Sequence, residues 1–264
     1  MLSYCANQVK EANRFNFQLC LFAPSADQEA LFSLFAFDAE VAKIPLVTTE
    51  SITGLIRLQW WQDAVDEIYG GTPRKHPVVE ALAEAVKSKN LPKELFDLYL
   101  RHREWELEPE DKPSSVVLQD YFDQVFGGFH HLLLRALEPN ASKELVDKAR
   151  TLGAIWGMVT LLAQLRAADQ SKDQKLVVIE AGEQLEGNFQ ILPDFVAGLL
   201  NDSKASQLKF PRNLLPLSGR KLAIGRGIKA MGQSSPGSMM TEIVQLASQG
   251  ASLSLLRMRL FGGK

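Results

Sequence analysis

The amino-acid sequence predicts an all-α protein, and three observations lead to that prediction. Apolar residues recur at three- and four-residue steps from end to end, whereas the strict alternation typical of strands is almost absent. The segment 152–162 is apolar nearly all round, as expected of a helix in the centre of a large helical domain. The chain has 264 residues, 46% of them hydrophobic and 23% charged, which suffices for a large core. We therefore expect a single domain over 1–264 with about ten helices.

The clearest helix lies between residues 48 and 70. Four apolar side chains at helical spacing share one of its faces: Leu58, Trp61, Val65 and Ile68. Gly70-Gly71, followed by Pro73, provides a stop signal. The remaining helices are expected at 3–16, 26–44, 77–88, 92–107, 114–137, 141–168, 190–200, 217–231 and 238–260.

Composition excludes several classes of protein. The formal net charge is −2 and there is no basic stripe, so nucleic acid is not an expected partner. Cys5 and Cys20 are too few for a disulfide framework or a metal site and fit a reducing compartment. The first residues form neither a basic leader nor an apolar signal segment, and the apolar stretch 153–165 is too short to cross a bilayer. We expect a cytoplasmic or organelle-matrix protein, with peripheral contact to the inner membrane left open.

Common catalytic motifs are absent. The sequence contains no His-Glu-x-x-His, no Cys-x-x-Cys, no Gly-x-Ser-x-Gly and no phosphate-binding glycine loop with Lys-Ser/Thr. His130 and His131 point in different directions on a helix, so we expect them to be partly buried structural residues. No metal ligand and no catalytic residue is predicted on these grounds.

Several phrases together resemble the squalene/phytoene synthase family. They are Tyr4-Cys5, the run Leu31-Phe32-Ser33-Leu34-Phe35-Ala36-Phe37, the run Ile56-Arg57-Leu58-Gln59-Trp60-Trp61-Gln62-Asp63, His76-Pro77-Val78, His102-Arg103-Glu104-Trp105-Glu106-Leu107 and Leu152-Gly153-Ala154. The resemblance covers roughly residues 3–170. It is strongest to the divergent branch that includes a mitochondrial complex I assembly factor.

The resemblance implies the all-α isoprenoid-synthase fold, with helices around a central cavity. In active members two Asp-x-x-x-Asp helices face each other, and their carboxylates hold Mg²⁺ ions that grip a diphosphate. Residues i and i+4 share a helix face, so both carboxylates of a motif reach one metal cluster.

This sequence departs from the family pattern in both motif regions. Matching the phrase that ends at Phe37 puts the first motif on 42–46, where Ala42 and Leu46 replace the aspartates and Lys43 adds a positive charge. Acids remain nearby at Asp38 and Glu40, but residues two apart do not share a helix face.

In the second region, matching Gly153 places Gln164 and Ala168 at the aspartate positions. Thr160 belongs to the same region, and Asp169 is the nearest acid. A neutral amide oxygen binds Mg²⁺ far more weakly than a carboxylate does. We therefore expect no cofactor, with Mg²⁺ required only if the chain is an enzyme after all.

The leading hypothesis is a non-catalytic scaffold that binds a protein partner, an apolar isoprenoid-like ligand, or both. The branch that it resembles implies a role in assembling respiratory complex I. The alternative hypothesis is an active prenyltransferase that condenses two prenyl diphosphates in a non-standard site.

Three residues are candidates for ligand binding. Arg57 is expected to face the cavity as a lone cation for an anionic head group, with Trp60 and Tyr121 beside the ligand. The structural alternative, which we favour for the tryptophans, is that Trp60 and Trp61 belong to the core.

The C-terminal segment 255–264 combines three basic residues with bulky apolar ones. This pattern is typical of an interfacial membrane helix, but it also fits a last core helix whose basic residues suit its C-terminal dipole, which we favour.

Overall fold

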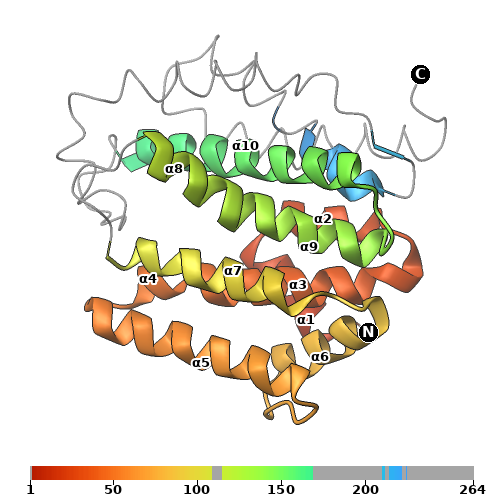
Figure 1. The fold of residues 1–264 in the computed structure, drawn as a ribbon, viewed down its shortest axis with the longest axis horizontal. Coiled ribbons are helices and arrows are strands. Elements are labelled where there is room, and N and C mark those ends of the chain that lie inside the picture. Colours follow the sequence, from red (N-terminus) through yellow and green to blue (C-terminus); the bar gives the residue numbers. More distant parts are fainter. Residues whose placement is uncertain (1, 109–114, 169–209, 212–213, 222–223, 225–264) are drawn as a thin grey trace.

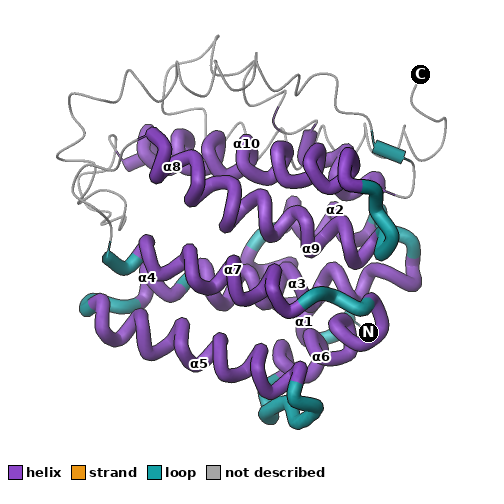
Figure 2. Tube along the Cα trace, in the orientation of Figure 1, coloured by secondary structure: helices purple, strands orange, loops and turns teal. Residues whose placement is uncertain are grey.

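The computed structural model describes residues 2–108, 115–168, 210–211, 214–221 and 224. Within these ranges every regular element is helical, which confirms the predicted fold class (Figures 1 and 2). The predicted helices 190–200 and 238–260, most of 217–231 and the segment 255–264 lie outside them. No described helix combines the length and apolar character that a bilayer crossing demands.

The elements follow one another with short connections. In chain order they are α1 (Tyr4–Ala12), α2 (Arg14–Leu21), α3 (Ser25–Ala42), α4 (Ile44–Val47), α5 (Ser51–Tyr69), α6 (Pro77–Lys89), α7 (Lys93–Arg103), the 3-10 turn η1 (Glu104–Glu106), α8 (Ser115–Tyr121), the π-helical segment η2 (Phe122–Gly127), α9 (Gly128–Leu137) and α10 (Lys143–Ala168). Residues 215–221 form a further helical segment.

The prediction of one helix over 3–16 is wrong, because the structure has two helices, α1 and α2, that meet at Asn13. Asn13 has an extended backbone, with φ −154° and ψ 101°, and its N–H donates to Val9 O at 2.8 Å. Its side-chain oxygen accepts a hydrogen bond from the N–H of Asn16 at 3.0 Å. One asparagine therefore ends α1 and caps α2, because its short polar side chain replaces the backbone partner that a helix start lacks.

The helix α3 lies at the centre of the described part. Residues 30–37 are buried without interruption, and α3 contacts α1, α2, α6 and α9. In Figure 1, α8, α9 and α10 lie on one side of the molecule, α7 and α3 in the middle, and α5 and α6 on the other side. We had expected 152–162 to be the enclosed helix, but Trp156 and Thr160 of α10 are only partly buried.

Close packing between η2 and α10 depends on glycine. A Cβ atom on Gly153 would lie 2.2 Å from Phe126 O, and one on Gly157 would lie 2.3 Å from the Phe126 ring. A Cβ on Gly127 would lie 3.0 Å from Arg150 O. The glycines therefore let the backbones of the two segments approach closely. We predicted one α-helix over 114–137, but the structure is π-helical over Phe122–Gly127.

Replacing Gly153 by alanine is expected to destabilise the fold by about 1–3 kcal/mol or more, because the new methyl group meets a backbone carbonyl that cannot turn away. Urea unfolding followed by circular dichroism measures the change.

Gly128→Ala is the matched control. A Cβ at Gly128 meets no atom within 4 Å, so this variant should be neutral or more stable by up to ~1 kcal/mol through helix propensity. Equal stability of the two variants would contradict the close contact between η2 and α10.

Candidate functional site

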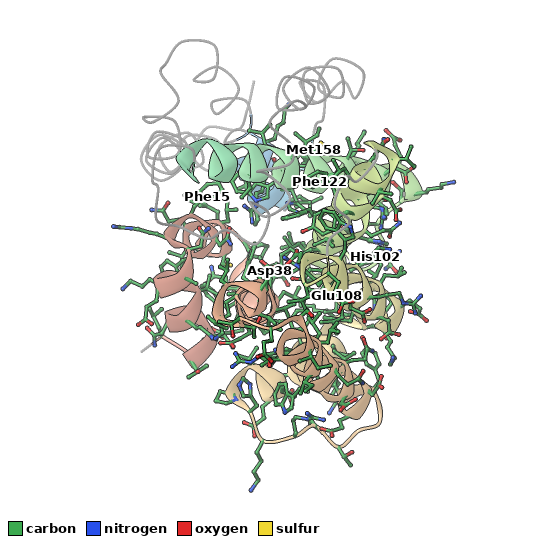
Figure 3. The ribbon with its side chains drawn as sticks, turned by 90° about the vertical axis from the view of Figure 1, so that its left-hand side faces the viewer. Phe15, Asp38, His102, Glu108, Phe122 and Met158 are labelled. Atoms are coloured by element: carbon green, nitrogen blue, oxygen red, sulfur yellow. The ribbon has the colours of Figure 1, made fainter. Side chains whose placement is uncertain are left out.

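A buried polar cluster joins α3, α7, η1 and α8. Its five members are Asp38, Tyr99, Arg103, Glu106 and Tyr121. Asp38 Oδ1 accepts hydrogen bonds from Tyr99 OH at 2.6 Å and from Arg103 Nη2 at 3.1 Å. Figure 3 shows Asp38 in the middle of the molecule, among the surrounding helices. The carboxylate of α3 is therefore bound to two donors of α7.

Arg103 lies between two carboxylates. Its Nη1 donates to Glu106 Oε1 at 2.6 Å, and the side chains of both residues are less than a tenth exposed. Arg103 Nη2 also donates to Tyr99 OH at 2.9 Å, and Tyr121 OH donates to Glu106. One guanidinium thus donates to both Asp38 and Glu106. Buried charges need such bonded partners of opposite sign, because they have been removed from water.

Burial sets the protonation of the cluster. It raises the pKa of Tyr99 and of Tyr121 well above the usual value of 10, so both phenols remain hydrogen-bond donors at neutral pH. Burial alone would lower the pKa of Arg103, but Glu106, the two tyrosines and Asp38 together raise it well above its usual value. The two phenols and the guanidinium are therefore suited to hold the helices in place as hydrogen-bond donors.

The structure brings together only some of the predicted site residues. Asp38 and Tyr121 both belong to the polar cluster. Glu40 instead accepts a hydrogen bond from Gln8 and forms an ion pair with Lys43 Nζ at 2.5 Å, at the end of α3 beside Ala42.

The second predicted region lies on α10. Thr160 Oγ1 donates to Trp156 O at 2.8 Å, within its own helix. Gln164 and Ala168 belong to the last turns of the same helix, and Asp169 lies outside the described residues.

Arg57 does not face the interior, and that prediction was wrong. It is exposed on α5, whose buried face is formed by Gly54, Leu58, Trp61, Ala64, Val65 and Ile68. The two tryptophans differ in exposure. Trp61 is buried against Phe37, whereas Trp60 is 37% exposed and lies under the guanidinium of Arg74. The core interpretation holds for Trp61 alone.

Sequence reasoning missed Tyr99, Arg103 and Glu106 as members of a site. The signal was present, because Phe96, Tyr99, Leu100 and Arg103 recur at the spacing of one helix face. A charged residue at the last position of a buried stripe indicates an internal partner.

His130 is buried and His131 is partly buried, close to the partly buried positions expected from the sequence. Burial lowers the pKa of His130 to about 3 and that of His131 to about 4, so both imidazoles are neutral at pH 7. His130 Nδ1 lies 2.8 Å from Phe126 O, and His131 Nε2 accepts from Arg135 Nε at 3.2 Å.

The fold is similar to that of solved isoprenoid synthases. A dehydrosqualene synthase in complex with a ligand matches with a TM-score of 0.72 at 14% identity, over 96% of this chain and 93% of that one. A squalene synthase from Alicyclobacillus acidocaldarius matches with a TM-score of 0.61 at 12% identity, over 98% of this chain and 92% of that one. At such low identity these likenesses define the class of fold, a squalene synthase-like helical domain.

The family model described as squalene/phytoene synthase matches residues 9–174. The chain therefore belongs to the squalene/phytoene synthase family.

Curated relatives belong to the divergent branch that the sequence resembles. The "NADH dehydrogenase (ubiquinone) complex I, assembly factor 6" of Mus musculus is 30% identical over 161 residues, and that of Homo sapiens is 29% identical over 161 residues. Each match covers 60% of this chain and 47% of the relative, so the chain spans about half the length of the curated relatives that it matches.

Replacing Arg103 by methionine is expected to cost about 3–5 kcal/mol of unfolding free energy, because Asp38 and Glu106 would lose the cation between them. Urea denaturation at pH 7 measures this loss.

The control is Arg101→Met, which removes the same charge from an exposed position of the same helix and should change stability by less than about 0.5 kcal/mol. If both variants lose the same amount, the buried cluster does not stabilise the fold as its geometry indicates.

Proposed function

We propose that the chain assists the assembly of respiratory complex I and does not catalyse metal-dependent prenyl transfer. Its curated relatives carry the name of a complex I assembly factor. The proposal places the protein in an organelle matrix or the cytoplasm, next to the inner membrane where such a complex resides.

The surroundings of the first motif region carry the non-catalytic part of the proposal. Holding several Mg²⁺ ions beside a diphosphate requires a group of free carboxylates. Here Asp38 is bound by Tyr99 and Arg103, and Glu40 is paired with Lys43. The described part of the chain contains no group of three or more acidic, histidine or cysteine side chains placed to share a metal ion.

The residues present therefore do not fit the Mg²⁺ cluster that the family implies. A guanidinium lies where Asp38 and Glu106 approach each other, and its positive charge opposes a dication there. At position 42 alanine offers no oxygen, and Lys43 adds a further cation. For these reasons, ionisation of a diphosphate by bound metal ions is not part of the proposed function.

An exposed apolar stripe on α4 and α5 supports the partner-binding part. We define it by five residues with their exposed fractions: Leu46 (62%), Val47 (54%), Ile52 (59%), Ile56 (64%) and Trp60 (37%). Ile52, Ile56 and Trp60 follow one another at four-residue steps and so share one helix face. Neighbouring exposed apolar side chains mark interaction sites, and the occupant proposed here is a protein partner.

With purified protein, farnesyl or geranylgeranyl diphosphate and Mg²⁺, we expect no pyrophosphate release above the protein-free rate. The physical reason is that Asp38 and Glu40, the acids near the first motif region, are already paired with Arg103 and Lys43. An active dehydrosqualene synthase run in parallel shows that the assay works. Release of pyrophosphate that depends on Mg²⁺ would establish the alternative, an active prenyltransferase.

Ile56→Glu is expected to abolish complex I assembly while leaving the fold intact, because it places a charge in the centre of the stripe at a side chain that is 64% exposed. The measurement is complex I content on native gels of cells that lack the endogenous protein and express the variant.

Thr72→Glu adds the same charge at an exposed position after α5, outside the stripe, and should restore complex I as the unmodified chain does. Normal assembly with Ile56→Glu would exclude the stripe as the partner surface, and failure of the unmodified chain itself would refute the assembly role.

A further inference from the structure

A surface groove lies between α3 and α6, two helices that pack directly against each other. Its volume is about 250 Å³, below the range of about 300–1,000 Å³ that is typical of sites for small molecules. The residues that line it are Ala26, Glu29 and Ala30 of α3 and Ala81, Glu84, Ala85 and Ser88 of α6. A groove of this size suits one long side chain of another protein better than a cofactor.

Alanine side chains form the floor of the groove. They recur at four-residue steps, at positions 26 and 30 of α3 and at positions 81 and 85 of α6, so each pair shares one helix face. Ala30 and Ala85 are buried, whereas Ala26 is exposed at the rim. Because alanine ends at Cβ, these residues leave a concave apolar surface on which the methylene stem of a longer side chain can lie.

Two carboxylates border this apolar floor. Glu29 reaches the groove from α3 and Glu84 from α6, and both residues are exposed. Neither forms a hydrogen bond or an ion pair with another residue in the part of the chain that the structure describes. Two unpaired negative charges at one groove attract a cation from a partner.

An ion pair beside the groove shows that a basic side chain fits between these two helices. Lys89 follows Ser88 at the end of α6, and its Nζ is paired with the carboxylate of Asp27, the residue after Ala26. Both side chains of the pair are less than a fifth exposed. Asp27 is therefore neutralised within the protein, and the acids left for an incoming cation are those that line the groove.

We propose that the groove binds an arginine side chain of the protein partner whose assembly the chain assists. The stem lies on the alanines, and the guanidinium donates hydrogen bonds to Glu29 and Glu84. Arginine suits the groove better than lysine, because its planar fork donates to two carboxylates at once and is more weakly hydrated. Arginine is also enriched at protein interfaces, where lysine is depleted.

This inference rests on the proposed function for the source of the arginine. It adds a second contact surface, which shares no residue with the apolar stripe on α4 and α5. The groove supplies charge recognition, and the stripe supplies apolar area.

The test is a titration of the full chain, labelled with ¹³C at its alanine methyl groups, with Nα-acetyl-arginine amide at low ionic strength. We expect saturable changes in the NMR signals of the four alanines of the groove. The citrulline derivative, in which an uncharged urea replaces the guanidinium, should bind at least about fivefold more weakly. Equal affinity for the two derivatives, or no saturable change at these alanines, would overturn the proposal.

Glu84→Gln keeps the size of the side chain and removes one charge from the groove, so it should weaken binding of the arginine derivative at least about threefold. Glu80→Gln removes an equal charge from an exposed position of the same helix that does not line the groove, and it should bind as the unmodified chain does. Equal effects of the two variants would show general attraction by a negative surface and would refute the groove as the site.

Complex I content in cells tests the source of the arginine. The double variant with Glu29→Lys and Glu84→Lys should lower complex I at least about threefold, because it repels the incoming guanidinium, whereas Glu80→Lys should restore complex I fully. Full restoration by the double variant would refute the groove as a partner surface and leave the assembly role intact. Failure of the unmodified chain would refute the assembly role, while the titration decides separately whether the groove binds arginine.

Discussion

The hydrogen bonds of Arg103 connect helices that lie far apart in the sequence. Removing a guanidinium and two carboxylates from water is expensive, and only bonded partners offset that cost. Arg103 meets this condition because Asp38 and Glu106 flank it and Tyr99 accepts from it. The position of α7 beside α3 therefore depends on a set of contacts that have Arg103 in common, and we expect all of them to weaken when its cation is absent.

The same contacts oppose metal binding at Asp38, as the non-catalytic part of our proposal requires. Carboxylates that hold divalent ions must keep their lone pairs free for them, whereas Asp38 directs Oδ1 at a phenol and a guanidinium. Glu40 is likewise occupied by Gln8 and Lys43. Both acids near the first motif region are therefore paired within the protein.

Much of the fold could be predicted from the sequence, because apolar periodicity reports directly on helices that bury one face. The helix 51–69 illustrates this, with its predicted stripe Leu58, Trp61, Val65 and Ile68 all buried. The break at Asn13 could not be located by periodicity, since the apolar pattern continues across it. The π-helical segment also escaped, because it depends on contacts with a helix some 25 residues further on, which no local pattern contains.

The site was harder to predict than the fold for a physical reason. Exposure decides the role of an arginine: Arg57, which we expected to face a cavity, is exposed, whereas Arg103 and Arg220 are buried. Arg103 shared a face with Phe96 and Tyr99 and could have been recognised. Arg220 lies in a short segment whose partners come from α2, α3 and α10, so only the tertiary structure reveals its surroundings.

The glycines of α10 have a consequence for how such a protein can change. Gly153 and Gly157 bring this helix against η2 through main-chain atoms, and neither contributes a chemical group of its own. Residues 160, 164 and 168, in the region where the family's second metal motif is expected, follow further along the same helix. Substitutions at residues 160, 164 and 168 can therefore change the chemistry that this half of α10 offers, while the glycine half keeps the helix in place against η2.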